Sequence, residues 1–227
     1  MTVHQFSKTG TYHTARNEEN QDCLYSIEEK DFLAVMLADG ATACERGLEG
    51  ARLSCEAMAQ VIRQEGSGFF HYPREKIAYL LTEQILYFLE RGTPDGCDIR
   101  AYGSTFSLAF LEKDTGRAVL VNLGDSAVIA VDENGFSYLL RPKRYRGAPC
   151  LTTTAGAGRA IEVAVRTLAP GGSILVCSDG FLDQLQKGSV ASLLNSYDTD
   201  GLDRQLSLLE NEDDCSYISF TRRRDQR

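Results

Sequence analysis

The amino-acid sequence predicts an α+β sandwich built from antiparallel strands and helices. Two pairs of apolar segments are each joined by a short turn, at Asp114-Thr115-Gly116 and at Glu133-Asn134-Gly135, which is typical of antiparallel hairpins. The helical patterns come in blocks and do not alternate with the strands, as they would in a doubly wound parallel sheet. No internal repeat or low-complexity linker divides the 227 residues, so we expect one domain over residues 1–227.

Apolar runs of strand length mark the expected strands. The first covers Phe32–Ala38 and ends at Asp39-Gly40, where a buried strand opens into a turn. The segment Pro142–Arg159 has no clear period and is expected to be a loop. The later strands are expected at Ser104–Leu111, Arg117–Val121, Ala127–Val131, Phe136–Leu140, Ser173–Cys177 and Tyr217–Thr221.

Helical spacing of apolar residues predicts two long helices between the first two expected strands. One covers Gly47–Gln64 and the other Pro73–Arg91, which begins on a proline, a residue favoured in the first helical turn. Tyr79, Tyr87 and Phe88 are expected to face the core from the second of these helices. Two short helical patterns are expected between residues 180 and 216.

Composition excludes several classes of function. The net charge of −8 argues against nucleic acid as a partner, because binding to the phosphate backbone needs a basic surface. No apolar run approaches the roughly 20 residues of a membrane span, and the N-terminal segment lacks the apolar core of a secretory signal. Seven cysteines, without a Cys-x-x-Cys pair, indicate a reducing compartment. We therefore expect a cytoplasmic protein that binds neither nucleic acid nor membrane.

An aspartate directly after an apolar strand recurs along the chain. Asp39, Asp125 and Asp179 lie in the sequences LADG, NLGDS and CSDG, and Asp213-Asp214 and Asp22 add further acids. A single aspartate of this kind is explained by turn formation or helix capping. Several strands that end at one edge of a sandwich would instead bring the carboxylates together, and like charges so placed need a cation to stay ionised. Hard oxygen ligands select Mg²⁺ or Mn²⁺ over zinc, and two such ions can activate a water and bind a phosphoryl group.

Six short motifs follow one another from about residue 10 to residue 221. They are Asn20-Gln21-Asp22, Asp39-Gly40 with Gly50-Ala51 beyond it, Gly103-Ser104-Thr105, Asn122-Leu123-Gly124-Asp125-Ser126, Ser178-Asp179-Gly180-Phe181-Leu182-Asp183 and Asp213-Asp214-Cys215-Ser216. In this order they resemble the metal-dependent protein phosphatases of type 2C, in a compact, bacterial form. Each motif alone is weak, but six in order are specific. The resemblance implies an α-β-β-α sandwich, with two antiparallel sheets packed face to face and helices on both outer sides.

The resemblance also implies a role for each residue of the site. Asp39 would bridge two Mn²⁺ or Mg²⁺ ions, and the carbonyl of Gly40 would ligate one of them. Asp179 and Asp213 would complete the first metal site. Asp22 would orient a water at the metals. These residues are the expected catalytic group.

Further positions complete the expected site. Gln21 would ligate the second metal, where many members carry Glu, and its uncharged amide is expected to make that site weaker. Asp125 and Asp183 match positions that hold a third, weaker ion in bacterial relatives. Arg16 is the candidate for bidentate binding of the substrate phosphate, one position earlier than the family arginine, with His13 close by.

The resemblance implies a monomeric serine/threonine protein phosphatase that acts in signalling. It would hydrolyse the phosphomonoester of a phosphorylated protein by attack of a metal-activated water. Ala41 stands where eukaryotic members carry a histidine proposed as general acid, so water at the metals is expected to protonate the leaving group. The alternative is a catalytically weak or silent phosphatase-fold protein that binds a phosphoprotein as a regulatory module. Gln21 and the shifted Arg16 motivate that alternative.

Other hydrolytic and nucleotide chemistries lack their motifs. None of the seven cysteines has an arginine six residues later, as a cysteine phosphatase requires. No Gly-x-Ser-x-Gly occurs around Ser126. Gly156-Ala157-Gly158-Arg159 lacks the Lys-Ser/Thr of a phosphate-binding loop and is expected to be a flexible loop. The basic tail Arg222–Arg227 is expected to be solvated.

Overall fold

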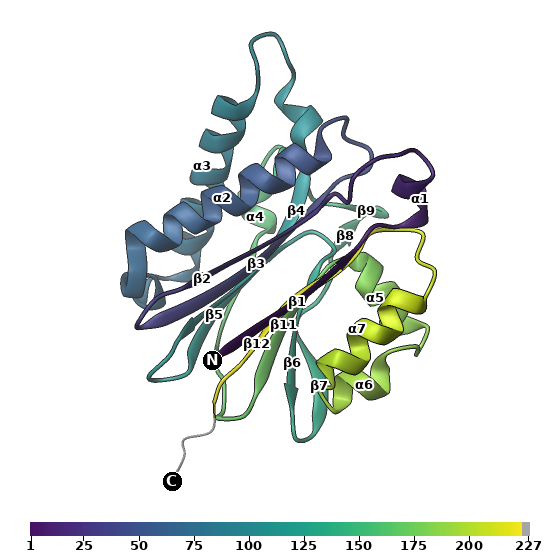
Figure 1. Cartoon of the computed structure of the whole chain (residues 1–227). Coiled ribbons are helices and arrows are strands. Elements are labelled where there is room, and N and C mark those ends of the chain that lie inside the picture. The colour runs from purple at the N-terminus through teal and green to yellow at the C-terminus, as the bar shows by residue number, and fades with distance from the viewer. Residues whose placement is uncertain (224–227) are drawn as a thin grey trace.

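The computed structural model, which describes residues 1–223, is a four-layer sandwich (Figure 1). Two five-stranded antiparallel sheets form the inner layers. In spatial order the first contains β1 Thr2–Lys8, β12 Cys215–Thr221, β11 Ser173–Cys177, β6 Ala127–Asp132 and β7 Gly135–Leu140. The second contains β10 Glu162–Thr167, β5 Arg117–Leu123, β4 Ser104–Glu112, β3 Phe32–Gly40 and β2 Asp22–Glu28. A small hairpin pairs β8 Arg144–Tyr145 with β9 Ala148–Pro149.

Helices cover the outer face of each sheet (Figure 1). The second sheet is covered by α2 Gly47–Glu65 and α3 Arg74–Gly92, with 3₁₀ turns at Gly66–His71 and Ile99–Tyr102 and the short α4 Ala157–Ala160. The first sheet is covered by α5 Asp179–Gln186, α6 Ala191–Asn195 and α7 Thr199–Leu208. A single short turn, α1 Thr11–Thr14, follows β1. The α-β-β-α architecture expected from the resemblance is confirmed.

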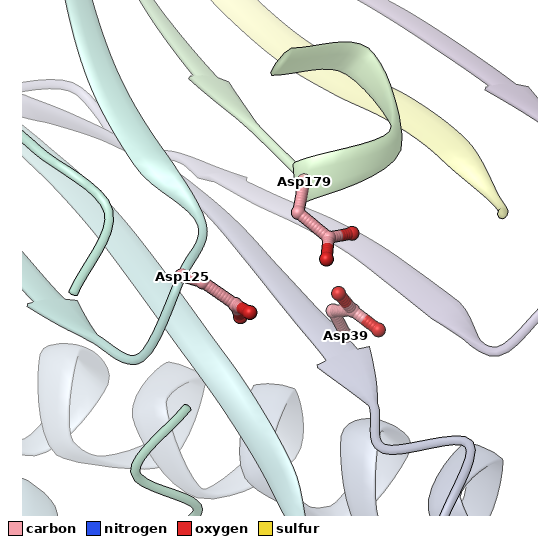
Figure 2. Close-up of side chains that lie close together, drawn as sticks. All are labelled: Asp39, Asp125 and Asp179. Carbon is pink, nitrogen blue, oxygen red and sulfur yellow. The ribbon is translucent and has the colours of Figure 1, made fainter. Parts of the chain in front are cut away.

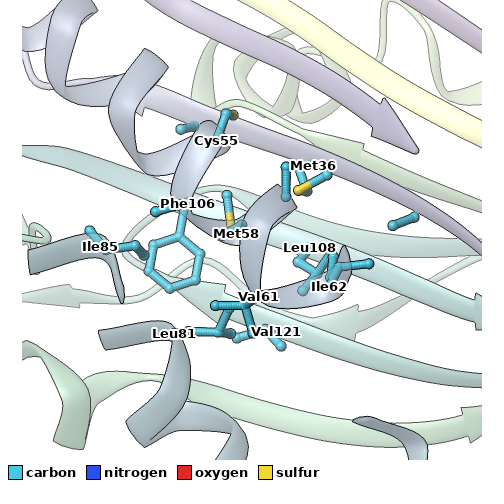
Figure 3. Close-up of a cluster of buried hydrophobic side chains, with 14 of the residues drawn as sticks. Met36, Cys55, Met58, Val61, Ile62, Leu81, Ile85, Phe106, Leu108 and Val121 are labelled. Carbon is cyan, nitrogen blue, oxygen red and sulfur yellow. The ribbon is translucent and has the colours of Figure 1, made fainter. Parts of the chain in front are cut away.

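The central strand β3 shows how the sequence fills two cores at once. Leu33, Val35 and Leu37 point into the core between the sheets, whereas Met36 and Ala38 point toward α2. Figure 3 shows this outer core, which also contains side chains of α3, β4 and β5. Because successive side chains of a strand face opposite sides, a strand buried on both faces must be apolar throughout. This explains the unbroken apolar run before Asp39.

The expected strands and long helices are present, most with ends shifted by one or two residues. The edge strands β1, β2 and β10 were not expected, because their half-exposed residues do not form the continuous apolar run that identifies the buried strands. The expected loop Pro142–Arg159 contains β8, β9 and α4, and three helices, not two, follow β11. The expectation of one domain over residues 1–227 stays a prediction.

Two other expectations are wrong. Tyr79 and Tyr87 are 61% and 47% exposed, so they lie on the outer side of α3 and not in the core. Arg222 is not simply solvated, because its guanidinium donates hydrogen bonds to the carbonyls of Leu168 (2.6 Å) and Thr115 (3.3 Å). Residues 224–227 of the basic tail lie outside the described residues. Between residues 1 and 223, no helix has both the length and the apolar character to cross a membrane.

The topology brings five acidic segments to one end of the sandwich. Asp22 begins β2 and is the register partner of Asp39 near the end of β3. Asp125 lies in the connection from β5 to β6, and Asp179 follows β11 at the start of α5. Asp213 lies two residues before the start of β12. The strand ends therefore position the candidate site.

Candidate metal centre

Three carboxylates converge at this end of the sandwich. Asp39, Asp125 and Asp179 each offer an oxygen, and these oxygens all lie within 4.8 Å of one another (Figure 2). Asp39 lies near the end of β3, Asp125 lies between β5 and β6, and Asp179 is the first residue of α5, so each is fixed by a different part of the fold. With Asp213, they line a cavity of about 260 Å³. Such a convergence of oxygen ligands is what a hard divalent cation requires.

The glycine after each of two acids is required by close backbone packing. A Cβ on Gly40 would lie 2.4 Å from the carbonyl carbon of Gly47, and a Cβ on Gly180 would lie 2.0 Å from the carbonyl oxygen of Asp214. Both distances are too short for any side chain. The two Asp-Gly pairs therefore serve two purposes, because the aspartate faces the cavity and the glycine lets a second segment pass directly beside it.

Asp22 and Asp179 carry buried oxygens that lack a protein partner. Both carboxylate oxygens of Asp22 and Oδ1 of Asp179 are shielded from solvent and make no hydrogen bond to residues 1–223. A buried carboxylate without a partner is costly. These oxygens and the neighbouring carboxylates are therefore a donor set that fits divalent cations.

Asp214 fixes the N-terminal segment against this site. Its carboxylate accepts hydrogen bonds from the backbone N–H of Gly10 (2.8 Å) and of Gln21 (2.6 Å). His13, which is 1% exposed, places its Nδ1 3.0 Å from Oδ2 of Asp214. Asp214 therefore holds the segment that leads into Asp22 next to the loop that carries Asp213.

Burial and mutual repulsion disfavour the charged forms of the acids. Burial first, and then the neighbouring carboxylates, raise the pKa of Asp22 and of Asp39 well above the usual range. The same causes, with burial again the largest, raise the pKa of Asp179 to about 7. Burial also raises the pKa of Asp125 and of Asp213. A bound cation would reverse this preference, because opposite charge favours the ionised form.

Arg144 is part of the site although no sequence motif identified it. From β8, its Nε lies 2.8 Å from Oδ2 of Asp125, and its Nη2 lies 3.0 Å from Oδ2 of Asp179. Its charge partly opposes the rise in the pKa of both carboxyl groups. Its only signal in the sequence was its place in the basic run Arg141-Pro142-Lys143-Arg144, which singles out no member.

Comparison with known proteins gives the family. Residues 9–210 match the family described as protein phosphatase 2C. The chain belongs to the protein phosphatase 2C family. A search of curated protein sequences finds no match.

Solved structures share the fold of this protein phosphatase 2C chain. A bacterial serine phosphatase matches with a TM-score of 0.72 and 14% identity over 100% of both chains. The serine/threonine phosphatase Stp1 from Staphylococcus aureus matches with a TM-score of 0.70 and 13% identity, over 96% of this chain and 93% of that one. RsbX in complex with magnesium matches with a TM-score of 0.61 and 15% identity, over 96% and 92%. At these identities the likeness shows the fold.

The remaining expected residues lie around the phosphatase 2C cavity and not in its acidic centre. Gln21 and Arg16 line a neighbouring cavity. Oε1 of Gln21 is buried and would lie 2.7 Å from a Cβ on Gly47, at the start of α2. The guanidinium of Arg16 stacks 3.6 Å above the ring of Tyr12. Asp183 lies on the exposed side of α5, one turn after Asp179.

The raised pKa of Asp179 predicts how the stability of the metal-free protein depends on pH. The folded state holds this proton up to a pKa of about 7, whereas an unfolded aspartate releases it near 3.9. Because the folded state then binds more protons, Asp179 contributes a stability that is lost as pH rises from about 4 to about 7. In EDTA, the melting temperature of Asp179→Asn minus that of wild type should therefore increase between pH 5 and pH 8, by roughly 5 °C.

Thermal unfolding of both proteins at the two pH values measures this difference. Subtracting wild type from the variant removes the contribution of all other titrating groups that the substitution leaves unchanged. A difference that is constant or decreases with pH would show that Asp179 does not hold a proton in the metal-free site.

Proposed function

We propose that this chain is a Mn²⁺- or Mg²⁺-dependent phosphatase that removes phosphate from phosphoserine and phosphothreonine in proteins. The observation that supports this most is the cluster of Asp39, Asp125 and Asp179 within 4.8 Å, beside the partnerless buried oxygens of Asp22. Family membership supports phosphatase chemistry. The donor set supports metal dependence, since only oxygen ligands converge there.

We assign the ligands as the resemblance to the family implies. Asp39, which has an oxygen within 4.8 Å of oxygens of both Asp125 and Asp179, would contact both ions, with Asp179, Asp213 and the Gly40 carbonyl on one of them. Asp125, with Asp183 on the next turn of α5, would serve a third, weaker ion. When bound, the cations would supply an activated water for attack on phosphorus and would neutralise the phosphoryl oxygens.

The chain's own residues would position the attacking water and form the walls of the cavity. Asp22, which is paired with Asp39 across the strands, would orient the attacking water by accepting its proton or a hydrogen bond. Ala41, Thr42 and Leu151 line the same cavity and carry no group that titrates near neutral pH. Because cations would keep the acids of this cavity ionised, the leaving alkoxide would take its proton from water.

The second candidate function is a phosphatase-fold protein that binds a phosphoprotein without hydrolysing it. One observation favours this alternative: Gln21 and Arg16 line a neighbouring cavity and not the one that the acids line. A site without a strong second-metal ligand would bind one cation and turn over slowly. The retained Asp39, Asp179 and Asp213 favour the enzyme, since clustered carboxylates are costly without cations.

We also propose that the enzyme acts as a cytoplasmic monomer on phosphoproteins. All seven cysteines are free thiols, which suits a reducing compartment.

Turnover assays test the proposed function. We expect hydrolysis of an aryl phosphate and of a phosphothreonine peptide with Mn²⁺ and none after removal of metal with EDTA. Asp179→Asn should reduce this Mn²⁺-dependent turnover by about a hundredfold or more, because it removes a charged ligand. Mn²⁺ binding without any turnover in wild type would favour the phosphoprotein-binding alternative.

A further inference from the structure

Arg144 occupies the acidic centre through a fork of two contacts. Its Nε lies 2.8 Å from Asp125 and its Nη2 lies 3.0 Å from Asp179, each at Oδ2. Within the described part of the chain, no other lysine or arginine forms an ion pair with an acid of the cluster. The side chain is 52% exposed, so the guanidinium lies at the rim of the cavity and can move.

The β8–β9 hairpin directs Arg144 toward the acids. The backbone N–H of Lys143 donates a hydrogen bond to the carbonyl of Gly124 (2.8 Å), which fixes the start of the hairpin beside Asp125. The side chain of Lys143 turns away and pairs with Glu162 of β10 at 2.6 Å. Tyr145, on the other side, is 69% exposed. Arg144 alone among these neighbours lines the acidic cavity.

The contacts of Arg144 compete with metal binding. Asp125 and Asp179 are carboxylates that the proposed function gives to the cations. The guanidinium occupies one oxygen of each, Oδ2, and its positive charge opposes the binding of a cation beside it. Filling of the site is therefore expected to release Arg144. The released guanidinium remains tethered at the rim by the hairpin, where the ligand to arrive is a phosphate monoester. A planar guanidinium suits bidentate contact with phosphate.

Arg16 is less suited to that contact. Its guanidinium stacks on Tyr12, and its Nη1 donates to the carbonyl of Tyr12 at 2.7 Å. It lines the neighbouring cavity and not the one that holds Asp39, Asp125 and Asp179. Contact with a phosphate in the acidic cavity would require it to leave both partners.

We propose that Arg144 binds the substrate phosphate, and that the acids hold it in place of the metal until cations displace it. The inference rests on the proposed phosphatase function. It couples metal loading to substrate binding, because the step that fills the site also frees the arginine.

Two measurements on Arg144→Ala test the two halves of this inference. Calorimetric titration of Mn²⁺ into the metal-free protein should give a dissociation constant three- to tenfold lower than in wild type, because the competing cation is gone. With Mn²⁺ saturating, KM for a phosphothreonine peptide and the inhibition constant of inorganic phosphate should both rise about tenfold, whereas kcat should change less.

Matched variants separate a specific role from a general charge effect. Arg146→Asn removes a positive charge from the same hairpin at a residue with φ of 52°, a conformation that asparagine tolerates, and should change neither constant. Arg144→Lys keeps the charge without the planar fork and should restore only part of the phosphate affinity. The melting temperature of each variant checks that it is folded.

The outcomes distinguish this inference from the proposed function. If wild type hydrolyses the peptide with Mn²⁺ but Arg144→Ala keeps the wild-type KM and phosphate inhibition constant, the phosphate role of Arg144 is wrong and the phosphatase stands. If Mn²⁺ affinity does not increase in Arg144→Ala, the competition is wrong. If wild type neither binds Mn²⁺ nor turns over, the proposed function itself has failed.

Discussion

Replacing Asp39 with asparagine should reduce phosphatase turnover by about a thousandfold or more. Asp39 is paired with Asp22 across the strands, and its carboxylate offers an oxygen within 4.8 Å of oxygens of both Asp125 and Asp179. The substitution keeps the size of the side chain but removes the negative charge shared by the two proposed ions. Initial rates on a phosphothreonine peptide over a range of Mn²⁺ concentrations measure the loss.

A matched control distinguishes this loss from a general effect of charge. Asp114→Asn changes an exposed aspartate in the turn between β4 and β5, at the far end of β4 from the site. It should leave turnover unchanged. Asp39→Asn turning over at the wild-type rate would remove Asp39 from the metal centre, and with it the bridging role proposed here.

Gly180→Ala should destabilise the protein and weaken metal binding although it changes no ligand. A Cβ at this position would lie 2.0 Å from the carbonyl oxygen of Asp214 and 3.1 Å from Nδ2 of Asn211. The start of α5 and the segment before β12 must therefore move apart, and they carry Asp179 and Asp213. We expect a loss of about 2–3 kcal/mol in the free energy of unfolding and a clear loss of Mn²⁺ affinity.

Denaturant unfolding and Mn²⁺ calorimetry measure these two effects. Gly68→Ala is the matched control, because a Cβ there would meet only the hydroxyl (3.5 Å) and Cζ (3.8 Å) of Tyr72, which are ordinary contacts. It should change stability by less than about 1 kcal/mol and leave Mn²⁺ affinity intact. Wild-type stability and affinity in Gly180→Ala would show that the backbone at the site is looser than the structure indicates.

The acids of the site could be predicted because their positions are set by local sequence. An apolar run fixes β3 or β11, and the Asp-Gly that ends each run places a carboxylate at the strand end. The sequence pattern could not show which acids come closest. That depends on how the two sheets pack, and the structure brings Asp39, Asp125 and Asp179 together.

The contact of Arg144 with the acids could not be predicted for a related reason. Arg144 reaches the acids through a two-residue strand whose anchor is a backbone hydrogen bond from Lys143 to Gly124, and backbone bonds leave no trace in the sequence. The position of Arg16 before the Asn20-Gln21-Asp22 motif makes it the candidate in the sequence. Its side chain instead packs on Tyr12, four residues earlier in α1.

Calorimetric titration of Mn²⁺ into the metal-free protein tests the central claim most directly. If the clustered carboxylates form a metal centre, wild type should bind about two ions, with the binding lost or greatly weakened in Asp39→Asn and unchanged in Asp114→Asn. Wild-type protein that binds no Mn²⁺ or Mg²⁺, or that binds them equally well after Asp39→Asn, would contradict the assignment of this acidic cluster as a metal centre.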